Sequence, residues 1–170
     1  MKNFIVITSI ALTEAITQYS KIKDWNLIVV GDRKGPNTFP LDSTFIKFRG
    51  DLESEYIFSK HAPVDHYSRK NIGYLHAIKK GAEFIYDTDD DNYPLPNWSN
   101  LFQEEKDLKF IASKEDFFNI YTLFTKEKIW PRGYPLEYIH KNIVPEYDKQ
   151  KCKIAIWQGL ADNDPDVDAI

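Results

Sequence analysis

Two unbroken apolar runs near the start of the chain limit its fold more than any other feature. The runs are Phe4–Ile7 and Leu27–Val30, and a helix-compatible stretch from about Thr13 to Ile22 separates them. Apolar runs without polar alternation are typical of strands covered on both faces, as in parallel sheets. The order strand, helix, strand predicts a βαβ opening, so the expected fold class is α/β, with a mostly parallel sheet flanked by helices.

The next segments continue this alternation of strands and helices. Phe45–Phe48 predicts a weaker third strand. Asp65 has the residue type of a helix N-cap and Gly81 that of a C-terminal stop, with apolar residues at helical spacing between them, so one helix is predicted there. Glu83–Tyr86 predicts a further strand. Strand patterns in the second half of the chain are Phe110–Ala112, Phe117–Phe124 and Ile154–Trp157.

The length of the chain predicts a single domain. Its 170 residues can bury a sizeable core, and no linker or repeat divides them, so we expect one domain over residues 1–170. The sequence stops at Ile170 as if within an element, so we expect the natural domain to be truncated here and to continue. No stretch approaches the roughly 20 apolar residues that a transmembrane helix needs, so no membrane span is expected in this chain.

Charge and cysteine content argue against several classes of function. The net charge is −4 and no stretch concentrates lysine and arginine, so nucleic acid is not an expected partner. The single cysteine, Cys152, excludes an internal disulfide and a cysteine-only metal site and favours the cytosol. The sequence contains neither a phosphate loop nor a dinucleotide-binding fingerprint.

The acidic run Asp87–Asp91 is the strongest indication of chemistry. It places four carboxylates in five residues directly after a predicted buried strand. Close carboxylates repel each other by roughly 1 kcal/mol per pair in water and about 4 kcal/mol at an effective dielectric of about 20, which a bound cation relieves. Hard oxygen ligands favour magnesium, manganese or calcium over zinc. In an extended backbone Asp89 and Asp91 project to one side and are the predicted metal ligands; the alternative is a solvated acidic turn.

Other polar residues follow the predicted strands, at the edge of the sheet where α/β proteins bind ligands. Thr8 and Ser9 follow the first strand. Asp32 follows the second, where its carboxylate could accept hydrogen bonds from a base or a ribose. Arg69 and Lys70 precede the acidic strand and could neutralise a diphosphate. The alternatives are ordinary polar turns and a surface pair near a helix start.

Two segments in the second half are candidate walls of a pocket. Arg132 lies between prolines in a loop that also contains glycine and aromatic residues. Asp164 and Asp166 follow the last predicted strand. Either carboxylate could act as a general base toward an acceptor hydroxyl, and an N-cap role for one of them is equally consistent with the sequence.

Four stretches of sequence carry a resemblance to a known family. They are Tyr67–Tyr74, Ile85–Asn92, Trp130–Leu136, and Gln158–Leu160 together with Asp164–Ile170. In these stretches the chain resembles the glycosyltransferase domain of the STELLO proteins. It resembles more distantly the plant reversibly glycosylated polypeptides, which are UDP-arabinopyranose mutases. The resemblance follows the same order and spans nearly the whole chain.

The resemblance implies a GT-A-like (Rossmann-like) fold and metal-dependent transfer of a sugar from a nucleotide-sugar, with a UDP-sugar as the expected donor. An Asp-x-Asp element, here Asp89–Asp91 with Asp90 at its centre, would bind manganese or magnesium and the diphosphate. Thr8, Asp32 and Arg69 would line the nucleotide.

The resemblance also bears on the acceptor side. In the mutase family the arginine of an Arg-Gly-Tyr-Pro loop receives the sugar, and Arg132 occupies that loop here. The predicted catalytic residues are therefore Arg132, Asp164 and Asp166. The expected acceptor is a carbohydrate or a protein.

Two other functions stay open at this point. A degenerate transferase domain could serve as a scaffold, because the STELLO proteins are linked to the assembly of cellulose synthase complexes. A metal-dependent phosphohydrolase could use the same aspartates. The expected compartment is the cytoplasm, with the Golgi lumen as the alternative if the chain is a fragment of a longer protein.

Overall fold

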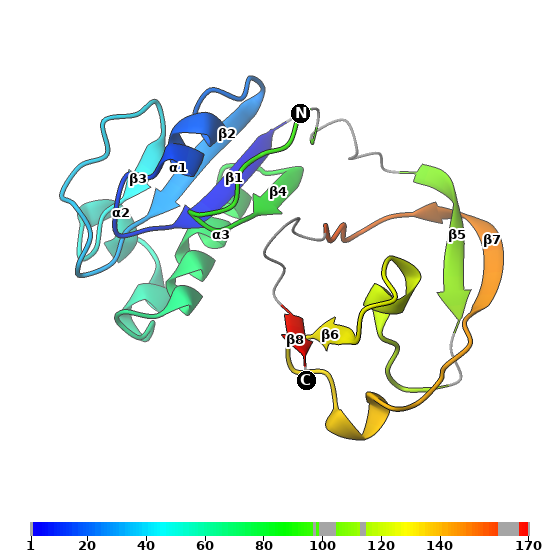
Figure 1. Cartoon of the computed structure of the whole chain (residues 1–170). Helices are drawn as coiled ribbons and strands as arrows, with labels where there is room; N and C mark the ends of the chain where they lie inside the picture. Colours follow the sequence, from blue (N-terminus) through cyan, green and yellow to red (C-terminus); the bar gives the residue numbers. More distant parts are fainter. Residues whose placement is uncertain (1, 97, 99–104, 113–114, 160–166, 170) are drawn as a thin grey trace. The chain divides into compact units, whose positions relative to one another are not determined.

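The computed structural model describes residues 2–96, 98, 105–112, 115–159 and 167–169. It divides into two compact units, Met1–Pro96 and Asn97–Ile170, and each is described here by itself (Figure 1). The single domain expected over residues 1–170 stays a prediction.

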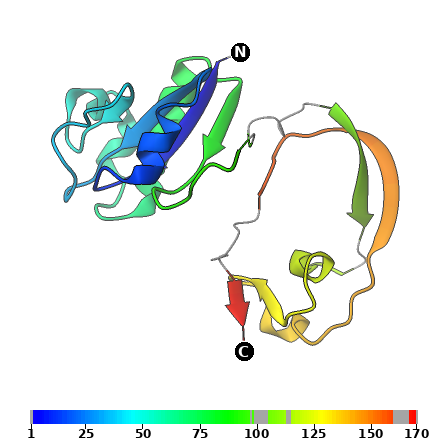
Figure 2. The ribbon, with the colours of Figure 1, turned by 45° about the horizontal axis from the view of Figure 1, so that its top comes forward.

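The first unit is built on a four-stranded sheet in the order β3-β2-β1-β4 (Figures 1 and 2). All neighbouring strands are parallel, and Ile5 in the middle of β1 pairs with Leu27 on one side and Tyr86 on the other. The α/β class with a mostly parallel sheet is thereby confirmed. The strands are β1 (Asn3–Thr8), β2 (Trp25–Val30), β3 (Thr44–Ile46) and β4 (Phe84–Asp87).

Short helices connect these strands. They are α1 (Glu14–Tyr19), α2 (Asp51–Ser54), the 3-10 helices η1 (Ile57–Lys60) and η2 (Tyr67–Arg69), and α3 (Lys70–Lys79). Gly81 has a φ of 81°, a backbone conformation that favours glycine, so the predicted helix stop is confirmed. The predicted N-cap at Asp65 is wrong, because His66 accepts the Ser68 N–H through Nδ1 at 3.1 Å and so caps η2.

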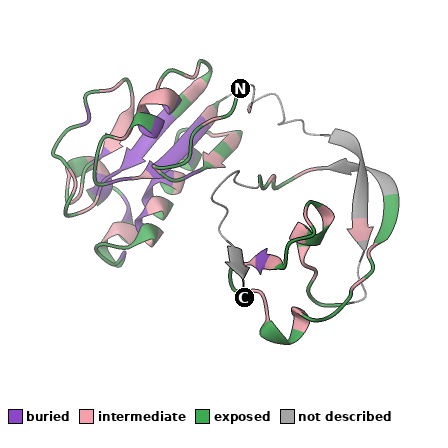
Figure 3. Cartoon of the chain, viewed as in Figure 1, coloured by how far each residue is buried: buried purple, intermediate pink, exposed green. Residues whose placement is uncertain are grey.

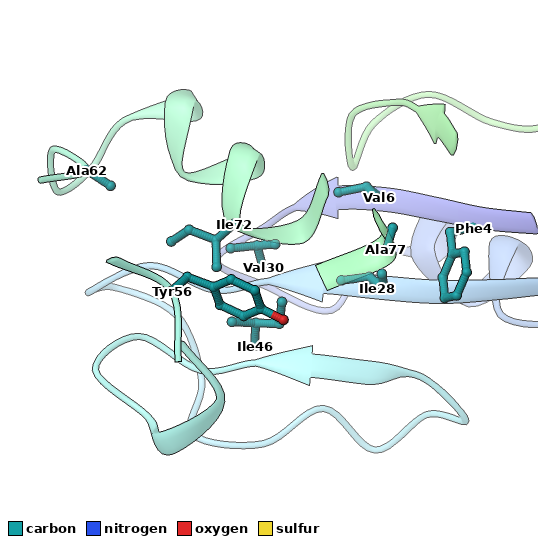
Figure 4. Packing of buried hydrophobic residues seen from close by; sticks show 9 residues of the cluster. All are labelled: Phe4, Val6, Ile28, Val30, Ile46, Tyr56, Ala62, Ile72 and Ala77. Carbon is teal, nitrogen blue, oxygen red and sulfur yellow. The ribbon is translucent and has the colours of Figure 1, made fainter. Parts of the chain in front are cut away.

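One core cluster of this unit lies between the sheet and α3. Figure 3 shows the middle of β1 and the C-terminal part of β2 buried, and Figure 4 shows side chains of both strands packing against those of α3. Gly73 lets the helix approach closely, since a Cβ atom there would lie 2.5 Å from Cγ1 of Val6 and 2.8 Å from Cγ2 of Val30. The core cluster comprises Phe4, Val6, Ile28, Val30, Ile46, Tyr56, Ala62, Ile72 and Ala77.

The second unit contains two antiparallel strand pairs, β5 with β7 and β6 with β8. Its strands are β5 (Glu105–Ala112), β6 (Ile129–Pro131), β7 (Glu146–Lys153) and β8 (Val167–Ala169). Its 3-10 helices are η4 (Ile120–Leu123) and η5 (Leu136–Tyr138). Throughout the described ranges, every helix of the chain falls short of the length and apolar character that a bilayer span requires.

Two strand predictions in this unit are wrong. Within the segment 117–124 the structure has η4, because Asn119 accepts the Tyr121 N–H at 3.1 Å and donates from Nδ2 to the Ile129 carbonyl at 2.7 Å, so its side chain stabilises a turn. The predicted strand Ile154–Trp157 is irregular, and the strand before it, β7, ends at Lys153. A charged segment forms β7 because its backbone pairs with β5, which strand propensity alone does not reveal.

Candidate functional site

A pocket opens at the carboxyl edge of the parallel sheet. Strand order reverses between β1 and β4, and ligands of open α/β sheets bind at such a point. The pocket holds about 360 Å³ and is lined by residues from the ends of β1 and β2, from the segment before α3 and from the acidic run. The structure brings five of the predicted site residues together in its lining: Thr8, Ser9, Asp32, Arg69 and Asp90.

Asp32 connects two walls of this pocket. Its Oδ1 accepts the Arg33 N–H at 2.7 Å, and its Oδ2 accepts the His66 N–H at 3.2 Å. The side chains of Arg33 and Asp65 form an ion pair between the same two loops. The loop after β2 and the loop before η2 are therefore tied together around the carboxylate that was predicted to bind a base or ribose.

An aromatic pair stands beside Asp32. The rings of His66 and Tyr67 are stacked with centroids 4.5 Å apart, and both residues line the pocket. Tyr67 is 78% exposed, so most of its ring is open to a ligand although it stacks on His66. The sequence patterns did not indicate this pair, because a lone histidine–tyrosine step is common on protein surfaces.

Arg69 lies beneath the pocket in a buried ion pair. Its side chain is 2% exposed, its Nη2 contacts a carboxylate oxygen of Glu53, and its Nε lies 3.5 Å from Oδ1 of Asp32. The guanidinium carbon is 4.8 Å from the centre of the Phe48 ring, a cation–π geometry. Sequence reasoning missed Glu53, since an acidic residue in a short helix looks like an ordinary solvated side chain.

Asp90 joins the acidic run to the end of β1. The Ser9 hydroxyl donates to the Asp90 carboxylate in a short contact, and the Thr13 hydroxyl donates to the Asp90 carbonyl at 2.6 Å. Thr13 also accepts the Ile16 N–H and so caps α1. The position of the acidic run is therefore fixed by β1 and α1 together.

Lys70 lies on the acidic run and is not among the residues that line the pocket. Its Nζ is 2.8 Å from Asp87 Oδ1, 2.6 Å from Asp89 Oδ1 and 2.9 Å from the Thr88 carbonyl. Burial lowers the pKa of Lys70, but the hydrogen bonds and charges of Asp87 and Asp89 outweigh it and raise the pKa above its usual value. One fixed ammonium therefore offsets part of the charge that four neighbouring carboxylates accumulate.

The predicted metal ligands Asp89 and Asp91 are both exposed. Asp91 makes no side-chain hydrogen bond or ion pair within the described ranges, and one oxygen of Asp89 is taken by Lys70. Across the same part of the chain, no three His, Cys, Asp or Glu side chains converge as a ready-made metal site. The carboxylate oxygens of Asp89 and Asp91 are of the kind that a hard divalent cation prefers.

The predicted acceptor-side residues belong to the second unit. Arg132 lies in a turn after β6 in which the Tyr134 N–H donates to the Pro131 carbonyl at 3.0 Å and Gly133 has a φ of 79°. Asp164 and Asp166 lie outside the described residues. The roles of all three residues stay predictions.

Comparison with known proteins identifies two relatives. The chain is 31% identical over 175 residues to "Probable glycosyltransferase STELLO1" of Arabidopsis thaliana, which covers 93% of this chain and 22% of the relative. It is 29% identical over 173 residues to "Probable glycosyltransferase STELLO2" of the same plant. That alignment covers 93% of this chain and 23% of the relative. No protein-family model matches the sequence.

The chain thus spans about a fifth of the length of the curated relatives it matches. The match nevertheless extends over both units and includes the acidic run. The resemblance to the STELLO proteins is therefore confirmed across nearly the whole of this chain, which is similar to one segment of those two relatives.

Proposed function

We propose that this chain is a metal-dependent glycosyltransferase unit that takes a UDP-sugar as its donor. The observation that carries the proposal is the gathering of Thr8, Ser9, Asp32, Arg69 and Asp90 around one pocket at the carboxyl edge of the sheet. The similarity to proteins named as probable glycosyltransferases supports the same class of reaction.

The nucleoside end of the donor would lie against Asp32 and Thr8. Asp32 already accepts two backbone N–H groups, but a carboxylate has about four acceptor positions, so it can still accept from a base N–H or a ribose hydroxyl. The face of Tyr67 offers a stacking surface beside it. The pocket therefore supplies both a directional acceptor and an apolar surface for a nucleoside.

The diphosphate would lie toward the acidic run, where Asp89 and Asp91 would hold manganese or magnesium. Magnesium commonly takes one or two protein carboxylates and completes its shell with substrate phosphate and water, which agrees with the sparse ligand set described above. Such an ion supplies positive charge that stabilises a departing diphosphate. Asp90 fixes the acidic run through Ser9, and Lys70 adds a positive charge beside it.

The residues proposed for the acceptor side belong to the second unit. We propose that Arg132 contacts the sugar or the acceptor, and that Asp164 or Asp166 takes the proton from an acceptor hydroxyl of a carbohydrate or a protein. Removing that proton as the bond to the anomeric carbon forms would let the hydroxyl oxygen attack without developing a positive charge.

Donor hydrolysis by the purified chain tests this proposal. The chain is incubated with a panel of UDP-sugars and manganese, and the release of UDP is measured. We expect metal-dependent release that is lost in the Asp89→Ala/Asp91→Ala variant. It should persist in Glu55→Gln, which removes an exposed carboxylate paired with Lys79.

Two results would contradict the proposal in different ways. Binding of UDP without turnover of any UDP-sugar would favour a scaffold that retains the pocket. Release of phosphate from small phosphoesters, unaffected by added UDP, would favour a phosphohydrolase.

A further inference from the structure

The buried pair of Glu53 and Arg69 carries an inference about how the pocket keeps its shape. Resting on the proposed function, we propose that both are positioning residues that hold the turn after β2, so that Asp32 is placed to receive the nucleoside. On this account the guanidinium of Arg69 stabilises the turn after β2 and does not bind the diphosphate.

Both carboxylate oxygens of Glu53, and Nε and Nη2 of Arg69, have polar partners. Glu53 and Arg69 are only 4% and 1% exposed. One oxygen of Glu53 contacts Nη2 of Arg69, and the other accepts the Arg49 N–H. The Phe48 ring lies against the Arg69 guanidinium. Neither side chain can therefore turn toward a ligand without leaving a buried partner unsatisfied.

The charge of Arg69 is already balanced where it lies. Two carboxylates, those of Glu53 and Asp32, face one guanidinium. A diphosphate would have to compete with both of them in a buried site, where breaking an ion pair leaves an uncompensated charge. The local balance of charge favours a structural role for Arg69 over the capture of an anion.

Two of the residues that Arg69 contacts, Gly31 and Asp32, line the pocket. Its Nε donates to the Gly31 carbonyl at 3.4 Å, while the Gly31 N–H donates to the Ile46 carbonyl of β3 at 2.9 Å. Asp32, the next residue, accepts the His66 N–H from the opposite loop. Loss of the pair would therefore loosen the turn on which the Asp32 carboxylate is carried.

A ligand series separates positioning from phosphate contact. Uridine, UMP and UDP with manganese are titrated into the wild type and into Glu53→Gln, Arg69→Gln and Glu53→Leu/Arg69→Met variants. The double variant replaces both charges by apolar side chains and guards against a misfolded single variant. If the pair positions Asp32, each variant weakens all three ligands by a similar factor, about tenfold or more, so the ratio of UDP to uridine affinity is unchanged.

The matched control is Lys79→Gln. It removes an exposed ion pair with Glu55 and should leave all three affinities unchanged. The inference is overturned if Arg69→Gln weakens UDP but leaves uridine unchanged, because that pattern indicates a phosphate contact. It is also overturned if Glu53→Gln leaves uridine binding at the wild-type value.

Amide hydrogen exchange gives a readout that needs no ligand. The Gly31 amide should exchange about tenfold faster or more in Glu53→Gln than in the wild type, while amides in the middle of β1 keep their protection and Lys79→Gln changes neither. Unchanged Gly31 exchange contradicts the inference. Faster Gly31 exchange in a chain that binds no uridine or UDP would contradict the proposed function while supporting the structural role of the pair.

Discussion

The two units of the chain differ in how many of their described side chains are buried. In residues 2–96, β1 and β2 form a sealed apolar interior in which Ile5, Ile28 and Val29 have no exposed surface. Among the described side chains of the second unit, only Trp130 is buried. Its strands pair through backbone hydrogen bonds, β5 with β7 and β6 with β8. Buried apolar area contributes roughly 25 cal/mol per Å², so among the described residues more of the apolar stabilisation resides in the first unit. That unit also carries the pocket, which gives the candidate binding residues a rigid support.

Truncation of core side chains should separate the two units most clearly. Ile28→Ala removes a fully buried side chain and should lower the opening free energy of the sheet by about 2–5 kcal/mol. Ile120→Ala, at a residue 36% exposed in the second unit, should cost less than about 1 kcal/mol. Hydrogen exchange resolved by segment measures both values. Equal losses of opening free energy for Ile28→Ala and Ile120→Ala would contradict the difference in side-chain burial between the two units.

Gly73→Ala should have a smaller effect that depends on the contact of α3 with the sheet. Alanine favours a helix over glycine by roughly 1 kcal/mol, so an exposed helix would gain stability. Here the added Cβ would overlap with Val6 and Val30, and overpacking of this kind costs about 1–3 kcal/mol. We expect a net loss in denaturant unfolding. A gain would mean that α3 packs less closely than described.

The smallest expected effect is a dependence on pH that belongs to the first unit. His76 is 4% exposed, and burial, with a smaller contribution from Lys80, lowers its pKa below 6.5. Its Nδ1 lies 2.8 Å from the Tyr56 hydroxyl. Below pH 6.5 the imidazole of His76 is protonated in the unfolded chain but stays neutral in the folded chain until a lower pH. The contribution of neutral His76 to the free energy of unfolding is therefore complete above pH 6.5 and is lost as the pH falls.

Unfolding of the wild type and of His76→Gln between about pH 7.5 and pH 5 measures this contribution. The wild type should lose more stability than the variant on acidification, by less than either core substitution costs. Identical pH profiles would show that His76 is not held in its neutral form.

Much of the first unit could be predicted from sequence because its signals are local. The runs Phe4–Ile7 and Leu27–Val30 have no polar interruption, which is typical of strands covered on both faces. Parallel strands bring their carboxyl ends to one edge, so Thr8, Asp32 and the acidic run could be expected near one another.

The features that sequence reasoning missed depend on contacts between distant parts of the chain. The burial of Glu53 follows from its encounter with Arg69, and no local pattern distinguishes it from a solvated glutamate. Likewise, Asn119 reaches the Ile129 carbonyl and turns an aromatic, strand-like segment into a 3-10 helix. Lys70 pairs with Asp87, the last residue of β4, and with Asp89 just after it, which places Lys70 on the acidic run and outside the pocket lining.

The most direct test of the central claim is calorimetric titration of UDP into the purified chain, with and without manganese. The titration is repeated on the Asp89→Ala/Asp91→Ala variant and on the Glu55→Gln control. The account predicts binding that strengthens with manganese in the wild type and the control and loses this dependence in the double variant. Absence of UDP binding under every condition would contradict the assignment of the pocket as a donor site.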